Sequence, residues 1–156
     1  MCYCFKYQTN NTHMYIISSC LVGVKCRYNG SCATIPKLEK LIVEGKALAV
    51  CPELLGGLPI PRNPCEIQEL QGKIVVRTEK HTDHTTEFEN GARKTLEICR
   101  IIGADKAILK SRSPSCGYGK IYDGSFNSLM VEGNGLTAEL LSKNGIEIFN
   151  EDNWNV

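Results

Sequence analysis

The stretch AILKSRSPSCG, residues 107–117, decides how this chain folds. Its apolar start, AIL, gives way to small polar residues, a proline and Cys116, which indicates a buried strand followed at once by a turn. Pro114 fixes its own φ and keeps the residue before it out of the helical region. Gly117 lets the backbone approach a neighbouring group closely. The sequence therefore predicts a thiol just beyond the carboxyl end of a strand.

Two other segments deliver a cysteine in the same way. Residues 14–19 form an apolar run with a serine pair and end at Cys20. The apolar residues 47–50 lead directly into Cys51. Ligands of open α/β sheets bind outside the carboxyl ends of the strands. We therefore expect Cys116 to meet these two thiols at one rim of a sheet.

Strands and helices alternate along the rest of the chain. This pattern favours an α/β fold: a single domain with a mostly parallel, Rossmann-like sheet, helices on both faces and a small extra hairpin. We expect Thr85 or Thr86 to cap the long helix together with Glu89, and Thr137 to cap the last one. The predicted strands cover residues 14–19, 47–51, 106–110 and 146–149, the helices 36–45, 85–103 and 136–142, and the hairpin 66–78.

Length and composition limit the class of protein. The 156 residues suit one domain, which we place at residues 14–156, after a flexible N-terminal extension over residues 1–13. A net charge of +1 gives no bulk attraction to nucleic acid or membranes. Nine cysteines without a signal peptide favour a reducing cytoplasm over a disulfide framework. We expect a cytoplasmic monomer or small homo-oligomer with a small-molecule partner.

Three thiols at one rim are more than a cysteine nucleophile and its base require. They suit a soft metal centre, such as zinc or an iron–sulfur cluster. The compact cysteine motifs of metal sites do not occur, however, and buried cysteines often act only as small hydrophobic residues. From the residues alone, a metal site and a set of structural thiols both stay open.

Residues 53–66 form a second segment with a functional pattern. They contain three prolines and two glycines, so we expect no regular structure there. They are also too apolar for a disordered linker. A loop of this length inside a compact domain is usually functional.

These features coincide in a known family, which the chain resembles over residues 14–150: the thiouracil desulfidase family, formerly a domain of unknown function. Two features depart from the family pattern, namely the N-terminal extension and Cys65, which stands where a small residue without a thiol is expected. The segments that carry the resemblance are SSCLVGVKCRYNG (18–30), CPE (51–53), GGLPIPRNP (56–64), FENGA (88–92), LKSRSPSCG (109–117), YDGSF (122–126) and GNGLT (133–137).

The resemblance implies a [4Fe-4S] cluster with three cysteine ligands, Cys20, Cys51 and Cys116, and one open iron that acts as a Lewis acid. Whether Cys26 touches the cluster stays open. The implied enzyme is a non-redox desulfidase. It removes sulfur hydrolytically from thiolated uracil or 4-thiouridine monophosphate and gives uracil or UMP and sulfide. The absence of a G-x-G-x-x-G fingerprint after the first strand agrees with this chemistry.

Hydrolysis of a thiocarbonyl requires a base for the attacking water. Glu53, two residues after Cys51, is the first candidate. Glu66 is the second, and substrate binding is its other expected role. Ser113 and Ser115 flank the thiol-bearing turn, where they could hydrogen-bond the pyrimidine or only cap the turn.

Further candidates for substrate binding lie in the loops at the same rim. Arg27 and Arg62 carry guanidinium groups that suit a 5′-phosphate, and either could instead form a structural ion pair. Tyr28 is expected to stack on the base or to pack its loop. Ser111 is a further candidate for a hydrogen bond to substrate.

Other functions would also require converging cysteines. An iron–sulfur or zinc-binding accessory protein in nucleic-acid thiolation, without desulfidase activity, also needs converging thiols. A purely structural domain would bury them without metal. The colour of an anaerobically purified sample separates these hypotheses, because an iron–sulfur protein is brown and a zinc protein is colourless.

Overall fold

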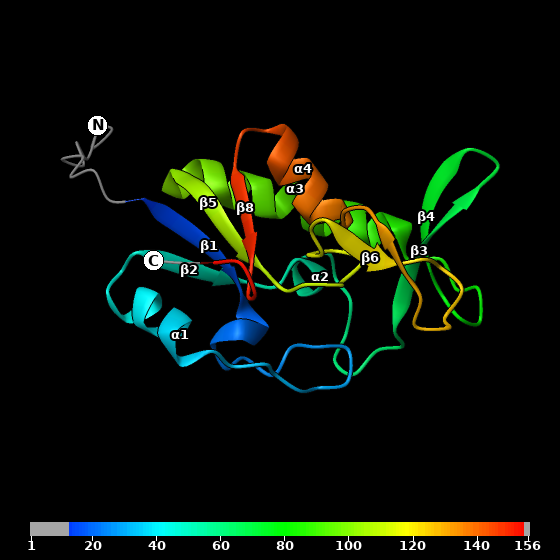
Figure 1. Cartoon of the computed structure of the whole chain (residues 1–156), viewed down its shortest axis with the longest axis horizontal. Helices are drawn as coiled ribbons and strands as arrows, with labels where there is room; N and C mark the ends of the chain where they lie inside the picture. Colours follow the sequence, from blue (N-terminus) through cyan, green and yellow to red (C-terminus); the bar gives the residue numbers. More distant parts are fainter. Residues whose placement is uncertain (1–12, 155–156) are drawn as a thin grey trace.

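A four-stranded parallel sheet forms the centre of the molecule (Figure 1). The computed structural model describes residues 13–154. The strand order is β2-β1-β5-β8, so the first strand lies between the two strands that lead to Cys51 and Cys116. The expected α/β fold with a mostly parallel, Rossmann-like sheet is confirmed. The strands are β1 (Met14–Ser18), β2 (Ala47–Val50), β5 (Ala104–Leu109) and β8 (Glu147–Asn150).

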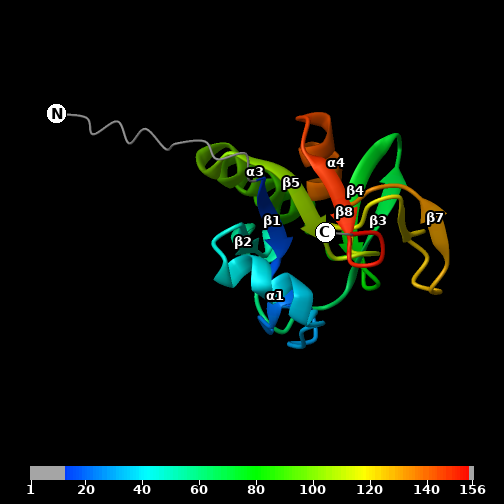
Figure 2. The same ribbon diagram turned by 60° about the vertical axis from the view of Figure 1, so that its left-hand side comes forward.

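Helices cover both faces of this sheet, as expected (Figures 1 and 2). Successive strand residues point to opposite faces, and β1 shows this directly. Ile16 packs beneath two helices on one face, and Ile17 packs against one helix on the other. The first face carries α3 (Thr85–Ile102) and α4 (Leu136–Lys143), and the second carries α1 (Pro36–Val43).

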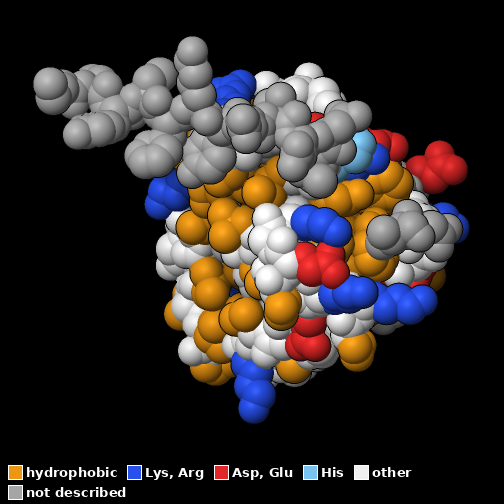
Figure 3. All heavy atoms as spheres, turned by 90° about the vertical axis from the view of Figure 1, so that its left-hand side faces the viewer, with side chains coloured by type: hydrophobic (Ala, Val, Ile, Leu, Met, Phe, Trp, Pro, Cys, Tyr) orange, Lys and Arg blue, Asp and Glu red, His pale blue; other side chains and the backbone are white. Residues whose placement is uncertain are grey.

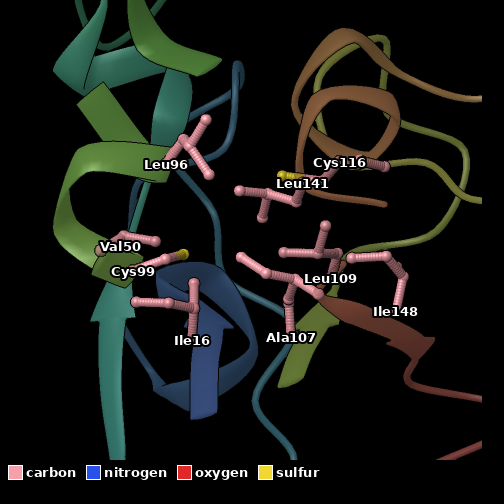
Figure 4. Close-up of a cluster of buried hydrophobic side chains, with 11 residues drawn as sticks. Ile16, Val50, Leu96, Cys99, Ala107, Leu109, Cys116, Leu141 and Ile148 are labelled. Atoms are coloured by element: carbon pink, nitrogen blue, oxygen red, sulfur yellow. The ribbon is translucent and has the colours of Figure 1, made fainter. Parts of the chain in front are cut away.

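The core between the sheet and α3 and α4 contains two of the cysteines (Figure 4). Leu96 and Leu141 from the two helices pack with Leu109 of β5. Cys99 is 1% exposed within this core, and Cys116 lies at its edge beside Leu141. Cys99 is therefore a packing residue, whereas Cys116 joins the core to the loop beyond β5.

Two antiparallel hairpins lie beside the sheet (Figure 2). The hairpin predicted over residues 66–78 is confirmed. A second hairpin follows the thiol-bearing turn, where the sequence indicated only a turn at Asp123 and Gly124. Its strands have three residues each, too few to show a clear alternation. The hairpins are β3 (Cys65–Leu70) with β4 (Lys73–Thr78), and β6 (Lys120–Tyr122) with β7 (Met130–Glu132).

Three local predictions were wrong. The segment after Cys51 begins with a one-turn helix, α2 (Pro52–Leu55), because proline fits the first position of a helix. The long helix has no side-chain cap, since the hydroxyl of Thr85 instead accepts from the N–H of Val76. The last helix likewise lacks the expected cap from Thr137, which lies inside it and is buried.

The side of the molecule on which β1 begins has a mixed surface (Figure 3). Hydrophobic side chains there lie among charged ones. Val43 and Ile101, the most exposed large hydrophobic residues among the described ones, lie near the ends of α1 and α3. Within residues 13–154, no helix is long and apolar enough to cross a membrane.

Candidate active-site cavity

The carboxyl ends of the central strands open into a cavity of about 480 Å³. The loops after β1, β2 and β5 form one part of its wall, and residues 62–66, Glu79 and the second hairpin form the rest. The structure thus gathers most candidate residues from the sequence at one place. The cysteines that line the cavity are Cys20, Cys26, Cys51, Cys65 and Cys116.

The three strand-end cysteines reach the cavity from different elements. Cys20 lies in a 3₁₀ turn, η1 (Ser19–Val22), directly after β1. Cys51 precedes α2, and Cys116 lies in the turn after β5. Cys20 packs into the core under α1, whereas Cys116 packs into the core under α3 and α4. Loops from both faces of the sheet therefore supply thiols to the cavity.

A further thiol, that of Cys26, lies beside two of these. It is 1% exposed and belongs to the same buried cluster as Cys20, against which Cys51 also packs. Its backbone is fixed on both sides. The N–H donates to the carbonyl of Val24 over 2.8 Å, and the carbonyl accepts from Arg62 over 3.1 Å.

The surroundings of Cys26, Cys51 and Cys116 keep these three thiols protonated in the free protein. Burial raises the pKa of Cys116 to about 12. Contact with Cys26, and then burial, raises the pKa of Cys51. Contact with Cys20 raises the pKa of Cys26 to about 11. Nucleophilic attack requires a thiolate, so these are poor nucleophiles, whereas a metal ion displaces the proton of a thiol that it binds.

A partly buried ion pair fixes Glu53 at the cavity wall. Nη2 and Nε of Arg62 donate to the same oxygen, Oε2 of Glu53, over 2.6 and 2.7 Å. The guanidinium also donates to the carbonyls of Pro59 and Cys26. The second carboxylate oxygen, Oε1, accepts from the hydroxyl of Ser113 over 3.3 Å. The guanidinium of Arg62 is thus fully engaged with groups of the protein. Of the two carboxylate oxygens of Glu53, Oε1 is the one that faces the thiol-bearing turn.

The two serines of the thiol-bearing turn have different surroundings. The hydroxyl oxygen of Ser113 accepts from the N–H groups of Ser115 and Cys116, each over 3.0 Å, so it caps the turn as well as contacting Glu53. Ser115 is 1% exposed, and its hydroxyl pairs with that of Thr137 at 2.8 Å. Ser113 lines the cavity and Ser115 does not.

Two glycines let α2 approach α3 backbone to backbone. A Cβ on Gly91 would lie 2.0 Å from the carbonyl oxygen of Pro52, and one on Gly56 would lie 2.0 Å from that of Glu87. Side chains at these positions would push the two helices apart. Because Glu53 lies on α2, this close contact sets where the carboxylate stands in the cavity.

The carboxylate of Glu151 anchors the first part of the loop after β5. It accepts from the N–H of Ser111 over 2.8 Å, from the Ser111 hydroxyl over 2.7 Å, and from the ammonium of Lys110. The N–H of Lys110 in turn donates to the hydroxyl of Ser18 over 2.9 Å. Ser111 lines the cavity, but its polar groups are engaged with Glu151.

The outer part of the cavity combines aromatic and charged side chains. Tyr28 and Phe126 line it, and Arg27 lies over the Tyr28 ring at 6.0 Å. Glu66 is 8% exposed, and its Oε2 accepts from the N–H of Phe126 over 3.1 Å. Neither Arg27 nor Arg112 forms an ion pair within residues 13–154, so both guanidinium groups are available to an anion.

The cysteine, glycine and proline segments around this cavity match a known family model. The model of 2-thiouracil desulfurase covers residues 15–153. The chain belongs to this family of desulfurase enzymes.

Two relatives show how far the similarity extends. An uncharacterised protein of Bacillus subtilis (strain 168), YbbK, is 44% identical over 148 residues, which cover 91% of this chain and 98% of that protein. A solved structure described as the [4Fe-4S]-dependent thiouracil desulfidase TudS is 45% identical, with a TM-score of 0.83. That match covers 90% of this chain and 91% of the solved one. The family membership predicted from the residues is confirmed.

Three residues at this site were not predicted from the sequence: Arg112 and Phe126, which line the cavity, and Glu151, which anchors the loop after β5. Glu151 directly follows β8, so the rule that ligands gather at the carboxyl ends of strands could have indicated it. Arg112 has a φ of 64° within the turn, and no local sequence pattern predicts this left-handed conformation. Phe126 comes from the second hairpin, which the sequence did not reveal.

Proposed function

We propose that this desulfurase holds a [4Fe-4S] cluster on Cys20, Cys51 and Cys116 and removes sulfur from thiolated uracil or 4-thiouridine monophosphate. The observation that carries the proposal is the arrangement of three strand-end thiols around one cavity with a fixed carboxylate, Glu53. The description of the similar solved structure as [4Fe-4S]-dependent supports the same cofactor here.

The set of donors fits an iron–sulfur cluster better than a single metal ion. In the described part of the chain, no three His, Cys, Asp or Glu side chains converge as ligands of one ion would. Soft thiolates are the usual ligands of iron–sulfur clusters. Cys20, Cys51 and Cys116, from the loops after β1, β2 and β5, would each supply one thiolate to a cluster in the cavity.

Residues of the chain would position and deprotonate the attacking water. When bound, the cluster supplies an iron that acts as a Lewis acid toward the thiocarbonyl sulfur. Oε1 of Glu53, which accepts from the Ser113 hydroxyl, would take a proton from the attacking water. Ser113 lies between this oxygen and the N–H groups of the turn, so its hydroxyl holds the carboxylate in line with the turn.

The overall reaction is a hydrolysis without electron transfer. The water oxygen becomes the new carbonyl oxygen, and the carbon–sulfur double bond is replaced by a carbon–oxygen double bond. The two protons of the water leave with the sulfur as hydrogen sulfide, or one of them goes to solvent when the product is the hydrosulfide anion. Thiouracil gives uracil, and 4-thiouridine monophosphate gives UMP, so no redox partner is required.

The outer cavity suits a nucleotide. A pyrimidine could stack on Tyr28 or Phe126, because every base has a π-face for aromatic side chains. The buried carboxylate of Glu66 is available to a ring N–H. Arg27 and Arg112 could bind a 5′-phosphate by charge-assisted hydrogen bonds. Arg62 is excluded from this role in the proposal because Glu53 holds it.

Anaerobic reconstitution of the full chain tests the proposal. We expect a brown protein with iron and acid-labile sulfide, which releases sulfide and uracil from 2-thiouracil and releases sulfide and UMP from 4-thiouridine monophosphate. A colourless zinc protein would refute the cluster. A brown protein that releases no sulfide from either compound would instead support an accessory role in nucleic-acid thiolation.

A further inference from the structure

The carboxylate of Glu66 is buried at the cavity without a positively charged partner. Glu66 is 8% exposed and lines the cavity. Glu53 and Glu151 each form an ion pair with a cationic side chain, whereas the only hydrogen bond to the Glu66 carboxylate within residues 13–154 comes from the N–H of Phe126 to Oε2. A carboxylate can accept about four hydrogen bonds, and burying one without partners is costly. Oε1 of Glu66 is therefore an acceptor available to a ligand in the cavity.

The two arginines closest to Glu66 in the fold do not neutralise it. Arg77 stands opposite Glu66 in the register of β3 and β4, but its guanidinium pairs with Asp83 over 3.2 Å. Arg112 lines the cavity beside Glu66 and forms no ion pair with it among the described residues. The carboxylate thus needs a donor that the described part of the chain does not supply.

The other carboxylate oxygen holds the side chain of Glu66 in place. Phe126 belongs to the loop between β6 and β7, and this loop is fastened to β3. Nε2 of Gln68 donates to the carbonyl of Gly124 over 2.7 Å. A Cβ on Gly124 would lie 2.6 Å from the carbonyl oxygen of Ile67, so glycine is required for this close contact. The hydrogen bond from Phe126 to Oε2 is therefore made between two fixed segments, and Oε1 is preorganised for a ligand.

We propose that Oε1 of Glu66 accepts a hydrogen bond from the N3–H group of the pyrimidine ring. The site then selects uracil-type rings, which carry a hydrogen on N3, over cytosine-type rings, which have a lone pair there. This inference rests on the proposed function, because it takes a thiolated uracil or its nucleotide as the molecule in the cavity.

The chemistry of the proposed substrates singles out N3–H. In 4-thiouridine monophosphate the sugar occupies N1, so N3–H is the one N–H group of the ring. N3 also lies between C2 and C4, the two carbons that can carry the sulfur, and turning the ring about its N3–C6 axis exchanges them. A single acceptor at N3 can therefore hold 2-thiouracil and 4-thiouracil rings alike.

A cytosine ring in the same place would bind poorly. The lone pair of its N3 would face the lone pairs of a buried carboxylate, and neither group would have a hydrogen-bond partner. A site built to hydrogen-bond an N–H group rejects the analogue that lacks it, because the buried polar group of the protein is left unpaired.

Direct binding of UMP and CMP tests the inference. The two nucleotides share the sugar and the phosphate, so contacts to those groups cancel in the comparison, and UMP is the expected product. Dissociation constants are measured by isothermal titration calorimetry on the full chain after anaerobic reconstitution. The test variant is Glu66→Gln. Glu69→Gln is the control, because Glu69 lies on the same strand but is exposed and does not line the cavity.

We expect the wild type to bind UMP roughly 10- to 100-fold more tightly than CMP, the scale of one hydrogen bond to a charged group. In Glu66→Gln the amide oxygen would accept from the N–H of Phe126, and the amide NH₂ would face the ring as a donor. The preference for UMP should therefore disappear or reverse in this variant, and it should persist in Glu69→Gln. If Glu66→Gln does not fold, Glu66→Ala takes its place, and its two dissociation constants should be nearly equal.

The outcomes separate this inference from the proposed function. Equal binding of UMP and CMP by the wild type, or binding of neither, overturns the inference and leaves Glu66 only the role of holding the Phe126 loop. A preference for UMP that survives the loss of the carboxylate also overturns it, because another group would then select the ring. A wild type that releases sulfide but does not distinguish the two nucleotides refutes only the role of Glu66. A wild type that prefers UMP through Glu66 but releases no sulfide refutes the proposed reaction and keeps the role of Glu66.

Discussion

Nη2 of Arg62 lies 2.6 Å from Oε2 of Glu53, and the two side chains form a largely buried pair in the wall of the cavity, 7% and 16% exposed. From the sequence, Arg62 is a candidate for binding a phosphate or for a structural ion pair, and Glu53 is the first candidate for the base that activates water. The pair means that Arg62 holds the carboxylate in place. Removing one partner of such a pair leaves an uncompensated buried charge, which is strongly destabilising.

The first prediction concerns Glu53. Glu53→Gln removes the counter-charge of Arg62 and should lower stability, but it keeps the size of the side chain and an acceptor for the guanidinium, so the protein should still fold and retain its iron. The amide cannot take a proton from water, and kcat should fall by about 10²-fold or more, the scale of a lost general base. Glu66→Gln is the matched control. Full activity in Glu53→Gln together with an inactive Glu66→Gln would move the base to Glu66.

The second prediction concerns the choice between base and nucleotide. Arg27→Ala should lower kcat/KM for 4-thiouridine monophosphate by roughly 10- to 100-fold, because a hydrogen bond to a charged group contributes about 1.5–3 kcal/mol. The same variant should turn over free thiouracil nearly unchanged. Equal kcat/KM values for nucleotide and base in the wild type would contradict a phosphate site at this rim.

Arg62→Ala provides the contrast to Arg27→Ala. It should lower the free energy of unfolding by about 3–5 kcal/mol, the scale for breaking a buried ion pair, and it should impair both substrates alike. Urea unfolding and parallel kinetics with the two substrates measure these effects. A selective loss of nucleotide turnover in Arg62→Ala would return the arginine to the phosphate.

The sheet and the meeting of the three thiols could be predicted because their signals are local. An apolar run that stops at a cysteine marks a strand end, and parallel strands bring their carboxyl ends to one edge. The partners of the side chains could not be predicted in this way. Arg62 could serve a phosphate or a carboxylate equally well until the fold places Glu53 beside it.

The same limit explains the wrong caps. Thr85 and Thr137 have side chains suited to capping, but the cap positions are held by His84 and Gly135, so both threonines lie inside their helices. Tertiary partners take their hydroxyls. Thr85 bonds to Val76 of the hairpin, and Thr137 bonds to Ser115 of the thiol-bearing turn. A capping pattern describes only the local competitors for a hydroxyl, and here the long-range partners prevail.

The third prediction separates the two serines of the turn. Ser113→Ala removes the group that caps the turn and contacts Glu53, so activity should fall together with the order of the loop. Ser115→Ala removes one buried hydrogen bond to Thr137 and should cost about 1 kcal/mol of stability with near-normal kcat. Chemical denaturation and steady-state kinetics test both. Inactivity of Ser115→Ala at unchanged stability would show that Ser115 acts in the reaction.

The fourth prediction concerns acid stability. Burial alone would raise the pKa of Glu151, but hydrogen bonds from Lys110 and Ser111 outweigh it and hold the pKa below its ordinary value of 4.5. A carboxylate with a lowered pKa in the folded state stabilises the protein at neutral pH and loses this effect as the pH falls below that value. Glu151→Gln should therefore be less stable at neutral pH and approach the wild type in acid.

Urea unfolding at stepwise lower pH measures this difference for Glu151→Gln. Glu147→Gln serves as the control, because its carboxylate is exposed and pairs only with Lys106 at the surface. A gap between wild type and Glu151→Gln that stays constant from neutral pH to well below 4.5 would mean that the carboxylate charge does not anchor the loop.

The fifth prediction concerns the cluster ligands. Cys20→Ser, Cys51→Ser and Cys116→Ser should each lose most of the iron and all activity, because three thiolates from three loops are needed to hold one cluster. Cys99→Ser should keep the iron, since this thiol lies in the core away from the cavity. Cys65→Ser should also keep it.

Cys65 makes this a demanding test because it too lines the cavity, with its thiol 3.7 Å from the carbonyl oxygen of Asn63. Burial raises its pKa to about 12, so it stays protonated unless a metal binds it. Iron and acid-labile sulfide are measured in each anaerobically reconstituted variant, beside its visible absorption. If Cys116→Ser keeps its iron and Cys65→Ser loses it, Cys65 is the third ligand in place of Cys116. The cluster would then bind on the side of the cavity formed by the first hairpin.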